Sequence, residues 1–196
     1  GMICTPELDV IGAGDGDINE PIRETYSARV RWLIANLGTA LVASSIVGMF
    51  GGAIEHMVAL AALMPIVAGV GGNAGTQTLA VTVRALAMNQ LTDSNSWRAV
   101  FREIKIALLN GGTIALIAGT ATALWFANPG LGGVIAAAMI VNIFVAGVAG
   151  VAIPLLLDRL DQDPAVASSI FVTMTTDSMG FLAFLGLAVA SGLTTL

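Results

Sequence analysis

The length of its uncharged segments constrains this chain more than any other feature. Residues 106–157 form 52 consecutive positions without Asp, Glu, Lys or Arg, and shorter uncharged runs cover residues 32–54 and 57–83. About 20 apolar residues cross a lipid bilayer as a helix. The longest run therefore predicts two crossings, with the turn between them at Asn128-Pro129-Gly130.

A fifth apolar stretch covers residues 165–193 and contains one charged residue, Asp177. The whole chain is 56% hydrophobic and 11% charged, whereas about a quarter of the residues in soluble domains are charged. These patterns predict an all-α integral membrane protein with five transmembrane helices per chain, in which residues 32–196 form the transmembrane domain.

The residues before the first uncharged run are expected to lie outside the membrane. Residues 1–20 are acidic and rich in glycine, which is typical of a flexible tail or of the remnant of a removed neighbouring domain. Residues 21–31 are predicted to form a short amphipathic linker helix that leads into the first span.

The basic residues predict the orientation of the chain, because Lys and Arg are enriched in cytoplasmic loops. With five spans, all eight basic residues fall on one side, and they are Arg23, Arg29, Arg31, Arg84, Arg98, Arg102, Lys105 and Arg159. The sequence therefore predicts a multi-pass protein of the cell membrane, with its N-terminus in the cytoplasm and its C-terminus outside.

Asp177 is the candidate functional residue, because it lies near the middle of the fifth stretch. A carboxylate at the centre of a membrane helix costs about 2.5 to 3.5 kcal/mol on insertion scales, and no Lys or Arg lies inside a span to form an ion pair with it. A bound cation, water, a proton or neighbouring hydroxyl groups remain as partners. Thr173 shares its helix face one turn earlier, and Gly180 is expected to expose backbone one turn later. Thr176 is expected to bond within its own helix.

The ligand types available in the spans narrow the choice of cation. No His or Cys lies within a span, which disfavours zinc and copper. A single carboxylate per chain suits a hard ion that keeps most of its water, as Mg²⁺ does, although ligand type leaves Mn²⁺ and Co²⁺ open. An odd number of spans excludes a simple internal duplication, so a symmetric pathway is expected to form by dimerisation, which would pair two Asp177 carboxylates.

The segment PIVAGVGGNAGTQT, residues 65–78, is unusually polar and poor in side chains for its apolar surroundings. Its glycines predict close backbone approach and irregular carbonyl directions, and its amides, Asn73 and Gln77, are expected to line a polar cavity. Small residues recur at helical contact spacing in this segment and in three other spans: Gly71 and Gly75; Ser44, Gly48 and Gly52; Ala115, Gly119 and Ala123; Ala146 and Gly150.

Enzymatic activity is not expected. Glu55 and His56 form a possible acid–base pair, but they lie in a short turn and no partner nucleophile is evident. The sequence predicts no nucleic-acid partner.

Three segments in combination resemble a known family. They are RVRWLIANLGTALVASSIVGMF (29–50), MPIVAGVGGNAGTQTLAVTVRALA (64–87) and DPAVASSIFVTMTTDSMGFLAFLGLA (163–188). They resemble the transmembrane domain of the MgtE family of magnesium channels and transporters, and the resemblance extends over about residues 21–193.

The resemblance implies a homodimer with a central cation pathway, formed mainly by the second and fifth spans, and Mg²⁺ recognition at Asp177 with Thr173 and Asn73 nearby. The pore-wall positions expected from it are Gly69, Gly72, Thr76, Gln77, Thr176 and Gly180. Full-length members of the family carry cytosolic domains that sense magnesium and close the pore. Residues 1–20 have no room for such a regulatory domain, so the chain is expected to be an isolated membrane domain or a short form.

The function predicted from the sequence is Mg²⁺-selective transport through a dimeric, channel-like pore. A proton- or sodium-coupled carrier of divalent cations and a membrane module without transport remain as alternatives.

Overall fold

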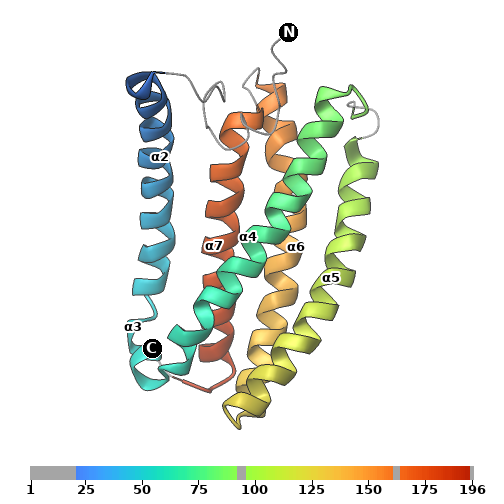
Figure 1. Cartoon of the computed structure of the whole chain (residues 1–196). Coiled ribbons are helices and arrows are strands. Elements are labelled where there is room, and N and C mark those ends of the chain that lie inside the picture. Colours follow the sequence, from blue (N-terminus) through green and yellow to red (C-terminus); the bar gives the residue numbers. More distant parts are fainter. Residues whose placement is uncertain (1–20, 92–95, 161–163, 195–196) are drawn as a thin grey trace.

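The computed structural model describes residues 21–91, 96–160 and 164–194, which form helices joined by short turns (Figure 1). The helices are α2 (Ile22–Gly48), α3 (Gly51–His56), α4 (Ala59–Ala87), α5 (Ser96–Trp125), α6 (Pro129–Arg159) and α7 (Pro164–Ala190). Of these described helices, all except α3 are long and apolar enough to cross a membrane, which makes five. The predicted all-α architecture with five spans is therefore confirmed.

The first span differs from the prediction in its boundaries. Residues 22–31 are helical and continue into the rest of α2 without a break, and α2 ends at Gly48 rather than near Ile54. A short turn then leads into α3. Gly48 is the last residue of α2, which fits the low helix propensity of glycine, about 1 kcal/mol less favourable than alanine in a helix interior.

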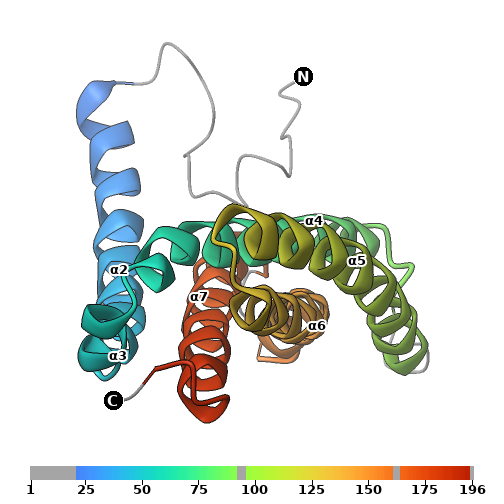
Figure 2. The same cartoon turned by 90° about the horizontal axis from the view of Figure 1, so that it is seen from below.

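Four of the helices, α4 to α7, form a bundle with α6 in its middle. This helix packs against α4, α5 and α7, and α4 also packs against α7. Because α6 lies in the middle, 44% of its most apolar window is buried, whereas only 6% of the corresponding window of α2 is buried. Figure 2 shows α2 standing at the side of the bundle, next to α7 and away from α5 and α6.

The hairpin of α5 and α6 depends on small residues. A Cβ atom added at Gly119 would lie 2.9 Å from Ala136 Cβ, and one added at Gly132 would lie 2.6 Å from the Gly119 carbonyl oxygen. The two backbones therefore cross at a distance that excludes larger side chains, which confirms the contact predicted at Gly119. By contrast, no atom lies within 4 Å of such a Cβ at Gly48, so this predicted contact is not made within the chain.

The turn between α5 and α6 lies where the sequence predicts it. Asn128 Oδ1 accepts a hydrogen bond from the Leu131 backbone N–H at 3.1 Å. Pro129 follows as the first residue of α6, where its missing N–H costs no helical hydrogen bond. A capping asparagine followed by proline thus ends one crossing and starts the next.

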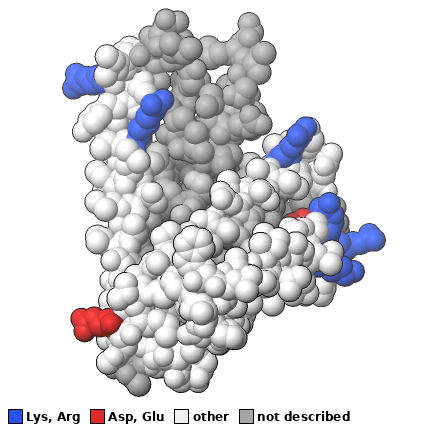
Figure 3. Space-filling model, turned by 60° about the horizontal axis from the view of Figure 1, so that its bottom comes forward, with Lys and Arg blue, Asp and Glu red and all other residues white. Residues whose placement is uncertain are grey.

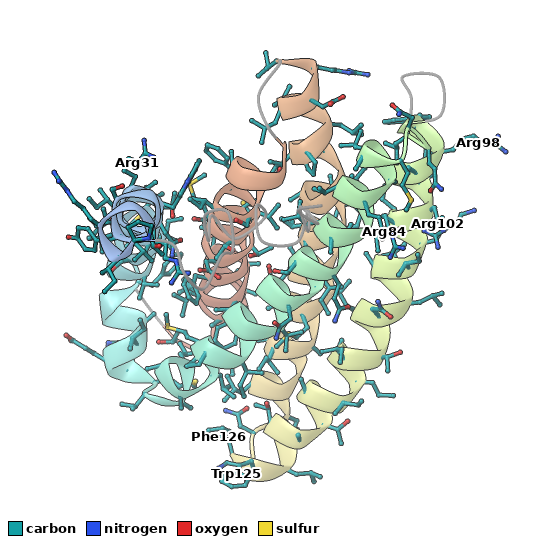
Figure 4. All side chains as sticks on the ribbon, turned by 45° about the horizontal axis from the view of Figure 1, so that its top comes forward. Arg31, Arg84, Arg98, Arg102, Trp125 and Phe126 are labelled. Atoms are coloured by element: carbon teal, nitrogen blue, oxygen red, sulfur yellow. The ribbon has the colours of Figure 1, made fainter. Side chains whose placement is uncertain are left out.

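The basic residues gather at one end of the molecule, which we call the basic end. It contains the first turns of α2 and α5 and the last turns of α4 and α6. Figure 4 shows Arg31, Arg84, Arg98 and Arg102 toward this end, with Trp125 and Phe126 at the other. Between these two ends, most of the face shown in Figure 3 is uncharged.

Candidate functional site

A buried asparagine joins α4, α6 and α7. Asn142 on α6 is fully buried, and its Nδ2 donates a hydrogen bond to the Val67 carbonyl oxygen on α4 at 2.8 Å. Two glycines face this side chain: a Cβ atom added at Gly71 on α4 would lie 2.6 Å from Asn142 Cγ, and one added at Gly180 on α7 would lie 2.9 Å from it. These glycines therefore set how closely α4 and α7 approach α6.

Asn142 was missed in the reasoning from sequence, although a signal was present. It is the one Asn or Gln in residues 131–157, and a polar side chain in an apolar membrane helix commonly forms hydrogen bonds between helices. Its Oδ1 atom is buried and accepts no hydrogen bond from the described residues.

Asp177 lies on α7, three residues before Gly180, so the crossing at Asn142 and the carboxylate belong to the same part of the helix. Its side chain is partly exposed. Within the described part of the chain, the carboxylate forms no ion pair and accepts no hydrogen bond. The described residues also contain no group of three or more His, Cys, Asp or Glu side chains placed to hold a metal. Asp177 is therefore a single carboxylate without a polar partner among the residues that the structure describes.

The other predicted residues of α7 have different environments. Thr176 is fully buried and its hydroxyl donates a hydrogen bond to the Thr173 carbonyl oxygen at 3.0 Å, which confirms the expected bond within its own helix. Thr173 is partly exposed, one turn from Asp177. Gly180 does not expose backbone beside Asp177, because Asn142 of α6 covers it; that expectation was wrong.

The glycine-rich segment is part of one continuous helix. The irregular carbonyl directions expected there are not seen, because α4 remains α-helical from Ala59 to Ala87, with Pro65 inside it. The predicted close approach is confirmed at Gly71 and at Gly75, where an added Cβ would lie 2.7 Å from Val172 Cγ1 of α7. The glycines at these two positions make room for neighbouring helices.

The remaining predicted residues of α4 mostly share an exposed face. Asn73 and Thr76 are exposed, and a Cβ atom added at Gly69 or Gly72 would meet no atom within 4 Å. Spacings of three and four residues place these four positions on one side of the helix. The Thr76 hydroxyl donates a hydrogen bond to the Gly72 carbonyl oxygen at 2.8 Å. Gln77 borders a cavity between α4 and α5, and the pore-wall role of all five residues stays a prediction.

Glu55 and His56 are both exposed at the end of α3. The described residues place no nucleophile in contact with them, so the structure adds nothing to an enzymatic interpretation.

Comparison with known proteins identifies related sequences. The profile of the MgtE family, described as a divalent cation transporter, matches residues 64–187. Proteins named magnesium transporter MgtE are 34% identical over 162 residues in Bacillus subtilis, 36% identical over 172 residues in Enterococcus faecalis and 37% identical over 189 residues in Thermus thermophilus. These matches cover 83%, 88% and 96% of this chain.

The chain spans only 36%, 38% and 40% of the length of these relatives. The family match nevertheless covers most of α7, including Asp177, and most of α4, from its second turn onward. Together with the five apolar helices, it shows that the chain belongs to the MgtE family of divalent cation transporters.

Proposed function

We propose that this chain carries Mg²⁺ across a membrane through a pathway in which Asp177 binds the ion. The observation that carries the proposal is the environment of Asp177: a carboxylate in an apolar membrane helix, partly exposed, with no polar partner among the described residues. Intramembrane acids are expensive and usually mark ion pathways. The curated relatives, each named a magnesium transporter, support Mg²⁺ as the ion.

A pathway between two copies of the chain is the arrangement that fits best. The exposed face of α4 carries the Asn73 amide, which has no hydrogen-bond partner among the described residues. An amide facing lipid without a partner is unfavourable, whereas the same amide facing water or a second subunit is not. A homodimer with α4 and α7 toward its axis would place this face and two Asp177 carboxylates around one aqueous path.

The number of acidic ligands suits an ion that is bound through its water. With one carboxylate from each subunit, the proposed site holds two, and Mg²⁺ is commonly held by one or two carboxylates while keeping several waters. The hydroxyl of Thr173 and the amide of Asn73 would then bind water molecules of the hydrated ion.

The basic end is proposed to face the cytoplasm, because cytoplasmic loops carry the excess of Lys and Arg. The N-terminus would then lie in the cytoplasm and the C-terminus outside, in a cell membrane. An inward potential favours entry of a divalent cation by about 4.6 kcal/mol per 100 mV, twice the value for a single charge. The Mg²⁺ gradient and the membrane potential would then drive uptake without a coupled ion.

The test of this function is a flux measurement on the purified chain in liposomes. We expect Mg²⁺ to enter when only a Mg²⁺ gradient and a K⁺-diffusion potential are applied, with equal pH and equal Na⁺ on both sides. Flux that requires a proton or sodium gradient would favour the coupled carrier instead. Absence of flux under all these conditions would favour a module without transport.

Glu55 and His56 provide a test of the enzymatic alternative. Because both side chains are exposed at the end of α3, the double change Glu55→Gln and His56→Gln is expected to leave Mg²⁺ flux within about two-fold of the unchanged protein, in line with the small effects of most surface substitutions. The same liposome assay measures it. A loss of flux would show that the pair contributes to function.

A further inference from the structure

A second polar site lies between α4, α5 and α6. A cavity of about 200 Å³ opens there, toward the basic end, and we call it the Glu103 cavity. Four of its lining residues carry oxygen atoms able to bind a cation: Gln77 and Thr78 of α4 and Glu103 and Asn110 of α5. A volume of this size holds several water molecules.

Glu103 has fewer partners than its burial requires. The residue is 9% exposed, and its carboxylate has two contacts: the Thr78 hydroxyl donates to Oε2 at a long 3.4 Å, and Arg102 Nη1 lies 3.1 Å from Oε1. A carboxylate has about four acceptor positions on its two oxygens. A buried charge is normally stabilised by close pairing and further hydrogen bonds. The carboxylate of Glu103 therefore has capacity for another ligand on the cavity side.

Arg102 is a weakly held partner. Its side chain is 69% exposed, and Figure 4 shows it pointing outward from α5 at the basic end. Neighbouring residues on a helix do not face each other, so Arg102 must reach around α5 to touch Glu103. The Arg102 end of this part-buried pair lies in solvent, where the attraction is weakened, so a cation that reaches the cavity can replace the guanidinium at the carboxylate.

We propose that the Glu103 cavity binds a hydrated divalent cation. Glu103 supplies the charge, Thr78, Gln77 and Asn110 supply neutral oxygen atoms, and the cation takes the place that Arg102 holds when no ion is bound. This donor set matches the oxygen ligands and retained waters preferred by hard divalent ions.

The proposed site is separate from Asp177. Thr78 contacts Gly150 of α6 on the side of α4 that faces α5 and α6, whereas Gly75 contacts Val172 of α7. An ion in the Glu103 cavity would thus bridge α4 to α5 on the side of α4 that carries Thr78, with Gln77 at the border between this side and the exposed face that carries Asn73.

The main alternative occupant is the phosphate of an anionic lipid. A neighbouring cavity of about 400 Å³ contains Arg98, Thr82 and Gln90 and shares Arg102 and Glu103 with the first. Basic pockets between membrane helices bind such headgroups. The two occupants make opposite predictions for Arg102, because a guanidinium competes with a cation but attracts a phosphate.

The experiment measures Mn²⁺ binding to the purified chain in detergent by electron paramagnetic resonance. Every variant carries Asp177→Asn, so that binding at the proposed pathway site does not contribute. We expect about one Mn²⁺ per chain, displaced by Mg²⁺, and binding weakened at least about ten-fold by Glu103→Gln, since a charged ligand atom is lost. Asp158→Asn, which removes an exposed acid at the same end, is the matched control and is expected to leave binding unchanged.

The second arm changes the basic partner. Arg102→Gln is expected to tighten Mn²⁺ binding by about two- to five-fold, because the change removes a competing guanidinium that is itself mostly exposed. Lys105→Gln removes the same charge from an exposed residue of α5 that does not line the cavity, and a smaller effect is expected from it. If Arg102→Gln and Lys105→Gln tighten Mn²⁺ binding equally, the effect comes from the loss of any positive charge and not from competition at Glu103. That result would overturn the assignment.

Three further outcomes overturn the proposal: Mn²⁺ binding that survives Glu103→Gln, no Mn²⁺ binding at all in the Asp177→Asn background, or Arg102→Gln weakening retention of phosphatidylglycerol without tightening Mn²⁺. Glu103→Asp keeps the charge and is expected to retain binding, which separates loss of the ligand from misfolding. Because flux is not the readout, failure here leaves the role of Asp177 untouched.

Discussion

Replacing Asp177 by Asn is expected to lower Mg²⁺ flux in liposomes by at least about 100-fold. A hydrogen bond to a charged group contributes about 1.5 to 3 kcal/mol, and a symmetric site loses this contribution twice, while each 1.4 kcal/mol corresponds to a factor of ten. The fold should persist, because the carboxylate makes no hydrogen bond or ion pair with the described residues. The fluorescence of a Mg²⁺-sensitive dye inside the liposomes measures the loss of flux. Size-exclusion chromatography of the same protein sample measures whether the fold persists.

The matched control for this change is Asp158→Asn. Asp158 is exposed near the end of α6, so the same loss of charge occurs outside the proposed pathway. We expect its flux to remain within about two-fold, in keeping with surface substitutions. Wild-type flux in the Asp177 variant, or equal losses in both variants, would contradict the role proposed for Asp177.

Replacing Gly71 by Ala is expected to destabilise the bundle by about 1 to 3 kcal/mol, the usual cost of inserting a methyl group into a packed core. The added Cβ would overlap the Asn142 amide, whose Nδ2 is held by its hydrogen bond to the Val67 carbonyl oxygen. Gly180 covers the same amide from α7, so the side chain cannot move aside without losing these contacts. Thermal unfolding in detergent, followed by circular dichroism, measures the loss.

Two further variants make this prediction specific. Gly112→Ala adds the same methyl group where no atom lies within 4 Å, and it should be neutral or slightly stabilising, since alanine favours helices over glycine. Asn142→Ala removes the side-chain amide that the methyl group of Gly71→Ala would overlap. The double variant should therefore lose less stability than the sum of the losses in the two single variants. A Gly71 variant as stable as the Gly112 variant, or strictly additive losses, would show that the contact is not limiting.

The helices were predictable because the bilayer imposes a simple length requirement. Uncharged runs and the Asn128-Pro129 turn located α4, α6, α7 and the end of α5 to within a few residues, and Asp177 was identified by its charge alone. The start of α5 at Ser96 lies well before the uncharged run, which begins at residue 106. The end of α2 at Gly48 was missed, since no charge marks it and helix propensity is a weak signal beside apolar length.

The glycine-rich segment shows where sequence reasoning reached its limit. Its composition predicted both close packing and broken helix geometry, and only the packing is present. Which glycines pack depends on their angle around α4: Gly71 and Gly75 face α6 and α7, whereas Gly69 and Gly72 face open space. The sequence shows where the glycines lie along α4, but it does not show which side of α4 faces α6 and α7. That side is known only once the neighbouring helices are in place.

Asn142 and Glu103 became candidates only in the folded chain. Each contacts a residue that lies far away in the sequence: Asn142 bonds to Val67, and Glu103 contacts Thr78. The sequence by itself determined the medium, the number of crossings, the clustering of basic residues at one end and the isolated carboxylate at Asp177, because these follow from apolar length and the cost of burying charge. Only the tertiary structure decided which polar groups meet, because contacts between helices depend on crossing angles and close packing that no single segment specifies.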